Sequence, residues 1–163
     1  MDSTILDKIN KQINLEAHSA YVYFHMAAYF DHLSLDGCAN WLKLQAKEEL
    51  SHMMKFYDYL ISQNQDVAFE IIDKPTKTWD TPLTAFSVAL AHEKKVTASI
   101  HDILDSAITI KDHRTVQFLQ WFVEEQIEEE QEVQNIVDKI KLIRKESTSI
   151  LLIDRELAKR STS

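Results

Sequence analysis

Glycine and proline are almost absent from this chain, and their scarcity limits the folds that it can adopt. The 163 residues include one glycine, Gly37, and two prolines, Pro75 and Pro82. All-β folds need many tight turns, and glycine and proline provide the backbone conformations that such turns require. We therefore expect an all-α protein. The length is that of one domain, residues 1–163, with enough chain to bury a core of its own.

Apolar residues recur in steps of three, four and seven along four segments, and such steps follow one face of a helix. In residues 4–31 this apolar face consists of Ile9, Ile13, Ala20, Tyr23, Ala27 and Phe30. The same spacing predicts three further helices, at about 38–64, 83–110 and 113–144. Thr81 and Pro82 suit the cap and first turn of the third predicted helix.

Polar residues interrupt each of the four apolar faces near its middle. They are Glu16 in the first segment, Gln45, Glu49 and His52 in the second, Glu93 in the third, and Gln126 and Glu129 in the fourth. Burying a lone charge costs several kcal/mol even after the protein relaxes. We therefore expect these groups to share something that neutralises them.

The connections between the segments predict a four-helix bundle. Residues 31–37 and 111–113 are short links, which join antiparallel neighbours. Residues 65–82 can span up to ~60 Å when extended, whereas the second helix is ~40 Å long. They therefore predict a long crossover that makes the second and third helices parallel and brings the four polar interruptions to one level. We expect its apolar residues to hold this crossover against the bundle, namely Phe69, Ile71 and Ile72.

A short fifth helix is predicted at residues 150–160, ILLIDRELAKR, after the polar sequence ESTS. Its apolar residues are more than a monomer usually leaves exposed, namely Ile150, Leu151, Leu152, Ile153 and Leu157. Assembly with other copies is the favoured explanation. The alternative is that the segment folds back onto its own bundle.

The composition excludes several classes of partner and location. The chain has 26 acidic and 18 basic residues, a net charge of -8, which argues against a nucleic-acid partner held through its phosphates and suits cations. Its single cysteine, Cys38, cannot form an intrachain disulfide, and the N-terminus lacks the pattern of a signal peptide. No apolar run is long enough to span a membrane. We expect a cytoplasmic protein.

Carboxylates with one imidazole and no thiolate form an oxygen-rich donor set that suits iron or manganese; zinc also fits, and copper fits less well. Two ions fit the set better than one. In this arrangement Glu49 bridges the ions, Glu16 and His52 hold one of them, and the other lies at Glu93 and Glu129. Few protein ligands per ion leave coordination positions open, as dioxygen chemistry requires. The same design, with Glu-x-x-His motifs, is known in ferritin-like carboxylate proteins.

The chain resembles the non-haem bacterial ferritins over nearly its whole length. The motifs that support the resemblance are NLEAHSAYVYF, KEELSHM, LAHEKK, FLQWFVEEQIEEE and LLIDREL. The resemblance implies a ferroxidase centre with two iron ions per subunit. It assigns Glu16, Glu49 and His52 to the first ion, and to the second Glu49, Glu93 and Glu129 with Gln126 beside it. It also places a tyrosine next to the centre, Tyr23, and a third iron at Glu48, Glu125 and Glu128.

The resemblance implies a biological role as well. Twenty-four copies form a hollow shell that oxidises Fe(II) with dioxygen or peroxide and stores the Fe(III) mineral inside. Haem is not expected, because Gln126 and Glu129 replace the second Glu-x-x-His motif of haem-containing bacterioferritins and Leu50 replaces their haem-ligating methionine. Val116 and Leu119 stand where animal ferritins carry pore acids, so the route by which iron enters is not set by the sequence.

Other interpretations stay open for individual residues and for the function. Trp121 suits a core aromatic residue, and Glu124 and Glu130 suit a solvated face. Three histidines recur every seven residues and are expected on the surface or at a subunit contact, namely His18, His25 and His32. The competing functions are a di-iron oxygenase or peroxidase, a catalytically silent structural subunit, and a DNA-protecting mini-ferritin.

Overall fold

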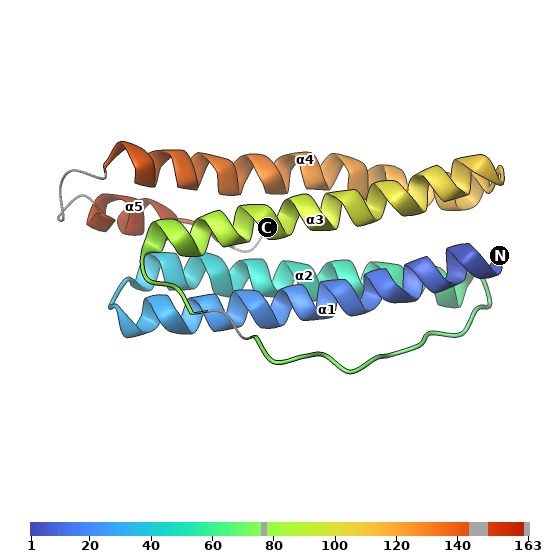
Figure 1. Cartoon of the computed structure of the whole chain (residues 1–163), viewed down its shortest axis with the longest axis horizontal. Helices are drawn as coiled ribbons and strands as arrows, with labels where there is room; N and C mark the ends of the chain where they lie inside the picture. The colour runs from blue at the N-terminus through green and yellow to red at the C-terminus, as the bar shows by residue number, and fades with distance from the viewer. Residues whose placement is uncertain (76–77, 144–149, 162–163) are drawn as a thin grey trace.

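The computed structural model describes residues 1–75, 78–143 and 150–161, and its regular structure is entirely helical (Figure 1). The helices are α1 (Ser3–His32), α2 (Asp36–Ser62), α3 (Pro82–Thr109), α4 (His113–Leu142) and α5 (Ile150–Leu157). Figure 1 shows α1 beside α2 and α3 beside α4, with α5 against one end of the bundle. The predicted all-α four-helix bundle, with its long crossover and short fifth helix, is confirmed.

Side-chain caps fix where three of the long helices begin. The Asp2 carboxylate accepts a hydrogen bond from the backbone of Thr4 at the start of α1. At the start of α3, Thr81 is the cap and Pro82 lies in the first turn, as the sequence predicted, and Thr84 completes a reciprocal capping box with Thr81. Asp112 caps α4 by accepting from the Thr115 amide. Each cap satisfies an amide that has no partner within its helix.

Two asparagines of α1 hold the crossover along the outside of the bundle. Asn10 accepts a hydrogen bond of 2.8 Å from the Ala68 amide, and Asn14 accepts one of 2.8 Å from the Glu70 amide. The prediction that apolar side chains hold this segment is wrong for Ile71, which is 94% exposed. Phe69 is 64% exposed, but its ring stacks on the Tyr57 ring of α2 with 6.4 Å between the centroids.

The short α5 folds back onto α2 and α4. Ile153 and Leu157 are buried in the core, whereas Leu151 and Leu152 are 48% and 65% exposed. The expectation that assembly covers the whole segment is therefore corrected, because half of its apolar face is covered by its own bundle. Predicted residues 158–160 form a turn rather than helix. The ESTS sequence and residue 144 of the predicted fourth helix lie outside the described residues.

Gly37 is required where α5 approaches the first turn of α2. A Cβ atom at this position would lie 1.8 Å from the carbonyl oxygen of Asp154. The Asp154 side chain in turn accepts a hydrogen bond of 2.8 Å from the Cys38 amide. Close approach of two backbones therefore explains the only glycine of the sequence.

The core consists of two apolar clusters, one toward each end of the bundle. The cluster at the end that carries α5 includes Tyr23, Phe30, Leu42, Phe86 and Val133. The cluster at the other end includes Ile9, Phe56, Ile100, Leu119 and Phe122. In the sequence of every long helix, predicted polar residues lie between these two clusters: Glu16 in α1, Glu49 and His52 in α2, Glu93 in α3, and Gln126 and Glu129 in α4.

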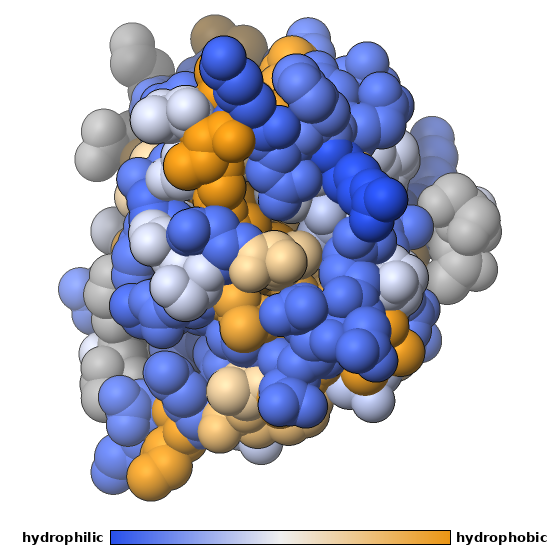
Figure 2. Space-filling model, turned by 90° about the vertical axis from the view of Figure 1, so that its right-hand side faces the viewer, coloured by the Kyte–Doolittle hydropathy of each residue, from blue (hydrophilic) through white to orange (hydrophobic). Residues whose placement is uncertain are grey.

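Figure 2 shows the end of the bundle where the N-terminus and the α3–α4 turn lie, and apolar atoms break its hydrophilic surface. Ile108 in the last turn of α3 is 56% exposed, and Ile110 in the turn is 47% exposed. Exposed apolar groups of this kind are typical of surfaces that contact other molecules. Among the described residues, no helix has both the length and the apolar character needed to cross a membrane.

Candidate metal centre

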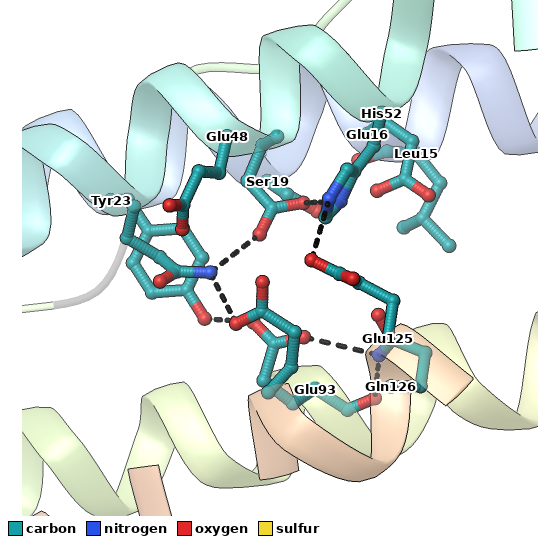
Figure 3. A network of polar contacts seen from close by, with 12 residues as sticks. Leu15, Glu16, Ser19, Tyr23, Glu48, His52, Glu93, Glu125 and Gln126 are labelled. Atoms are coloured by element: carbon teal, nitrogen blue, oxygen red, sulfur yellow. Dashed lines mark hydrogen bonds and ion pairs between the residues drawn. The ribbon is translucent and has the colours of Figure 1, made fainter. Parts of the chain in front are cut away.

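Six polar side chains from all four long helices meet at mid-height between the two apolar clusters, and none is more than 4% exposed. They are Glu16 of α1, Glu49 and His52 of α2, Glu93 of α3, and Gln126 and Glu129 of α4. Figure 3 shows labelled members of this group turned toward one another in the space between the helices. The structure thus brings together the residues that the interrupted apolar faces singled out.

Two overlapping sets of side chains have the geometry to hold a metal ion. The first is Glu16, Glu49 and His52, whose ligand atoms all lie within 4.8 Å of one another. The second, by the same measure, is His52, Glu125 and Glu129. His52 belongs to both sets, because its Nδ1 lies 3.7 Å from Glu49 and its Nε2 lies 3.8 Å from Glu125. Carboxylate oxygens and imidazole nitrogens at this spacing suit a divalent cation.

Glutamine amides orient the carboxylates. Gln12, one turn before Glu16, donates a 2.8 Å hydrogen bond to Glu16 Oε1. Gln45, one turn before Glu49, donates to Glu49 Oε1 at 3.1 Å and to Glu129 Oε2 at 2.6 Å. An amide donor holds a carboxylate in place without adding a charge to the centre.

The carboxylate of Glu93 is held by α1 and α4. Gln126 donates to its Oε2 at 3.3 Å, and the Tyr23 hydroxyl donates to its Oε1. Tyr23 is fully buried, and burial followed by the charge of Glu93 raises its pKa well above the ordinary value. Tyr23 therefore lies against the centre as a neutral hydrogen-bond donor, next to the carboxylate that the sequence assigned to the second ion.

Burial and mutual repulsion make three of the carboxylic acids hard to ionise. Burial, then the charge of Glu49, raises the pKa of Glu16 well above its ordinary value, and burial with the charge of Glu93 does the same for Glu129. Burial and the charge of Glu49 raise the pKa of Glu93 to about 8. Without a cation, Glu93 is therefore mostly protonated at neutral pH, and the pKa values of Glu16 and Glu129 are shifted in the same direction.

Glu49 and His52 form the ionised pair of the centre. Burial opposes the charge on Glu49, but hydrogen bonding to His52 and the charge of His52 outweigh burial and lower its pKa. Burial also opposes the charge on His52, but Glu125 and Glu49 outweigh it and raise the pKa of His52 to about 11. The imidazole of the protein without metal therefore carries a proton that a metal ion has to displace.

The structure contains one atom that a cation would satisfy directly. Oε2 of the fully buried Glu16 has no hydrogen-bond partner within the described residues. A buried carboxylate oxygen left without a partner costs free energy unless a positive ion or a donor meets it. The orphan oxygen, the clustered ligand atoms and the excess of acids over bases all fit a bound divalent cation.

The three acids assigned to a third ion do not lie together in the same way. Glu125 is part-buried and faces His52, as described above. Glu48 is paired with Arg160, the residue that follows α5 in the turn. Glu128 is exposed to solvent. A pocket of about 260 Å³ lies beside Glu48, His52 and Glu125, and His52 is the residue of the buried centre that lines it.

Several other residues lie elsewhere than the sequence suggested. Trp121 is 39% exposed rather than a core residue, and its ring meets the His52 ring edge-on at 5.5 Å between centroids. Glu130 is part-buried rather than solvated, because it accepts a 2.6 Å hydrogen bond from Thr97. Leu119, which stands where animal ferritins carry a pore acid, is fully buried in the core, and Val116 is part-buried.

The three regularly spaced histidines lie outside the two candidate ligand sets. His25 and His32 are exposed, and His18 is half-buried. His18 lies 6.2 Å from the His92 ring and His25 lies 4.9 Å from the Trp79 ring, measured between centroids. This agrees with the expectation that they face outward rather than into the centre.

The sequence model of the family described as Ferritin-like domain matches residues 6–143. The chain belongs to the ferritin family. Among curated relatives, it is 37% identical to a bacterial non-heme ferritin of Staphylococcus saprophyticus, over 99% of this chain and 96% of that protein. It is 32% identical to a bacterial non-heme ferritin of Escherichia coli O6:H1, over 94% and 93% of the two chains.

Solved structures of ferritins have the same fold as this chain. An open pore ferritin from the hyperthermophilic archaeon Archaeoglobus fulgidus superimposes with a TM-score of 0.97 at 40% identity, over 99% of this chain and 98% of that chain. A structure described as a humanized archaeal ferritin also gives a TM-score of 0.97, at 39% identity over 100% and 99% of the two chains. The resemblance to non-haem bacterial ferritins is therefore confirmed.

The sequence analysis singled out Gln45 but missed the other residues that support the ligands of this ferritin centre, namely Gln12, Ser99 and Arg160. Gln12 and Gln45 each lie one turn before a carboxylate of the centre, and this i, i+4 spacing is a signal that the sequence contains. Ser99 donates a 2.5 Å hydrogen bond to Gln12 from α3. Arg160 approaches Gln45 from beyond α5. Neither of the last two has a local signal, because each contacts its glutamine across more than eighty residues of sequence.

Proposed function

We propose that this ferritin-family chain stores iron, oxidising Fe(II) to Fe(III) with dioxygen at the buried centre and holding the ferric mineral inside a hollow shell of many copies. The observation that supports it most is the convergence of four buried carboxylates and one imidazole, with one oxygen of Glu16 left without a partner. Relatives named as bacterial non-heme ferritins along nearly the whole chain support the storage role.

In this proposal two Fe(II) ions bind as substrates. Glu16, Glu49 and His52 bind the first, and Glu49 bridges to the second, which Glu93 and Glu129 hold with Gln126 beside it. The lowered pKa of Glu49 suits a bridging role, because it is the acid of the cluster that is ionised before any metal arrives. Tyr23 and Gln126 donate to Glu93 and keep its carboxylate facing the second ion.

In this proposal, iron binding displaces protons from residues of the centre before dioxygen reacts. An Fe(II) ion approaches from the pocket at Glu48, His52 and Glu125, whose lining also includes Lys47 and Lys55. It displaces the proton of His52, and a second ion displaces the proton of Glu93. The two bound ions supply the electrons for dioxygen, and few protein ligands per ion leave positions where dioxygen can bind. The apolar clusters on either side exclude water from the centre.

The proposal includes a third iron ion, with a ligand set that differs from the one expected from the sequence. His52, Glu125 and Glu129 provide one set of ligand atoms close enough for an ion. Glu48 is engaged by Arg160, so its part in that site requires the ion pair to open. Glu128 would join from the solvent side.

The competing functions agree less well with the structure. The ligands Glu16, Glu49 and His52 come from one chain, whereas the mini-ferritin alternative requires a metal site between subunits. An intact set of buried acids argues against a silent subunit, because acids without a role would be costly to bury. An assembly of twenty-four copies and peroxide as an alternative oxidant stay predictions that follow from the resemblance, and a cytoplasmic location stays a prediction from the composition.

Aerobic iron titration of the size-fractionated particle tests the proposal. We expect a very large particle that oxidises about two Fe(II) per chain in a fast phase, before slower mineral growth. The double variant Glu49→Ala with His52→Ala should lose the fast phase and keep its particle size. The matched control is Glu124→Ala, which removes an exposed acid of α4 and should keep the fast phase.

Two results would contradict the proposal. One is a fast phase that survives in the double variant, which would place iron oxidation elsewhere on the chain. The other is a small oligomer that reacts dioxygen with an organic substrate, which would favour the oxygenase alternative.

A further inference from the structure

Arg160, the residue that follows the short helix α5 by a single turn, is anchored at both ends against α2. Its side chain is 16% exposed and lies over the Trp41 ring, with the guanidinium carbon 4.4 Å from the ring centroid. Its backbone carbonyl accepts a 3.4 Å hydrogen bond from Asn40. A guanidinium stacked and hydrogen-bonded in this way has a fixed orientation.

The guanidinium has two groups of partners, one charged and one neutral. Nη2 is paired with Glu48 and lies 3.8 Å from Glu132. Nη1 donates a 2.9 Å hydrogen bond to the side-chain oxygen of Gln45. The contact with Gln45 connects Arg160 to the metal centre, because Gln45 is fully buried and also contacts Glu49 and Glu129.

Gln45 has its carbonyl and amide ends in different environments. Its oxygen accepts from Arg160, while its nitrogen donates to Glu49 at 3.1 Å and to Glu129 at 2.6 Å. If the amide were flipped, a carbonyl oxygen would face two carboxylates and an NH₂ group would face a guanidinium, and both contacts would be repulsive. Arg160 and the two carboxylates therefore favour the same orientation of Gln45, and Arg160 holds its oxygen end.

We propose that Arg160 is a positioning residue of the metal centre, which acts through Gln45 to hold the carboxylates of Glu49 and Glu129 in the geometry that binds metal. The inference rests on the proposed function of that centre. The inference also links the packing of α5 to metal binding, because Arg160, which contacts the buried amide of Gln45, lies just after α5.

The charge of Arg160 and its positioning role predict opposite effects, which makes the inference testable. A cation near a metal site repels the incoming ion, so removal of the charge alone would tighten metal binding. Loss of the Gln45 contact frees the amide to rotate, which weakens metal binding. Replacement of residues that orient metal ligands commonly lowers metal affinity by about 10-fold to 100-fold.

The experiment measures Co(II) binding to the assembled metal-free particle of four proteins: the wild type, Arg160→Met, Gln45→Met and the double variant. Titration gives the affinity, and the visible ligand-field spectrum of bound Co(II) reports ligand geometry, which a purely structural role of Arg160 would leave unchanged. Arg155→Met is the matched control, because Arg155 is exposed on α5. Arg160→Lys tests rescue, since a lysine ammonium can still donate to Gln45. Particle size and thermal unfolding show that each variant keeps its fold.

We expect Arg160→Met to bind Co(II) about 10-fold more weakly with an altered spectrum, Arg160→Lys to recover part of the loss, and Arg155→Met to match the wild type. The double variant should lose no more than Gln45→Met alone, because both changes break one connection. Unchanged or tighter binding by Arg160→Met overturns the inference, as do losses that add in the double variant. A wild type that binds no Co(II) overturns the proposed function and this inference together, whereas equal binding by wild type and variants overturns this inference only.

Discussion

Filling the metal centre at neutral pH should release protons, and the structure sets a lower bound on their number. With a pKa of about 8, Glu93 holds about 0.9 of a proton at pH 7 in the metal-free protein. With a pKa of about 11, His52 holds about one. Both protons leave when a carboxylate and a neutral imidazole bind metal. Burial raises the pKa values of Glu16 and Glu129 in the same direction as that of Glu93.

We therefore expect at least about two protons per chain to be released when Co(II) fills the centre at pH 7. Because two protons compete with the metal, the overall constant for filling the centre should rise about 100-fold between pH 6 and pH 7. Calorimetric titration in two buffers of different ionisation enthalpy measures the proton count directly. Repeating the titration across this pH range measures the slope of affinity against pH.

A matched comparison shows where the protons come from. The double variant Glu49→Ala with His52→Ala lacks one of the two proton sources and much of the binding site, so its release should fall well below that of the wild type. Glu124→Ala alters only an exposed acid and should release as many protons as the wild type. Release of less than one proton per chain by a fully loaded wild type, or an affinity that does not change between pH 6 and pH 7, would refute the reasoning.

Three further predictions concern the same centre and its supports. The pKa of Glu93 is higher in the folded protein than in the unfolded chain, so its contribution to the free energy of unfolding is fully present below pH 4.5 and is lost as the pH rises to about 8. The loss is up to about 1.4 kcal/mol per pH unit. Thermal unfolding of the metal-free particle across this pH range measures it. Gly37→Ala should cost about 1–3 kcal/mol, because its Cβ would collide with the α5 backbone, and denaturant unfolding against an exposed Ser51→Ala control measures the difference. Tyr23→Phe removes a hydrogen-bond donor that lowers the pKa of Glu93, so Co(II) binding at pH 7 should weaken about 10-fold. The control Tyr21→Phe changes a tyrosine that is 52% exposed and should leave the Co(II) affinity unchanged. Equal affinity in both variants would contradict this role for Tyr23.

The sequence predicted the ligand-bearing residues because their signal is local. Glu16 and Glu93 each interrupt a run of apolar residues at helical spacing, and that pattern can be read without knowing what lies opposite. The crossover has no such helical pattern, and the prediction for Ile71 was wrong, because an apolar residue in an extended segment does not reveal which side faces the protein. There the decision came from Asn10 and Asn14 on another helix.

The supporting residues could not be predicted in this way. Ser99 and Arg160 contact their glutamines from distant parts of the chain, at a point that only the packing of the helices defines. Nothing near Arg160 in the sequence marks it as different from Arg155 on the same segment. The difference arises because α5 packs against α2 and the following turn directs Arg160 toward Trp41 and Gln45.

The choice of glutamine beside the carboxylates follows from what the centre has to bind. A lysine or arginine in place of Gln12 or Gln45 would hold Glu16 or Glu49 more strongly, but its charge would neutralise the acid and compete with the metal. An amide donates hydrogen bonds and leaves the negative charge for the cation. Arg160 supplies positive charge in this region, yet it contacts the centre only through the neutral Gln45 and directs its charge to Glu48. The side chains nearest the ligands are thus fixed in place while the charge imbalance that attracts Fe(II) is preserved.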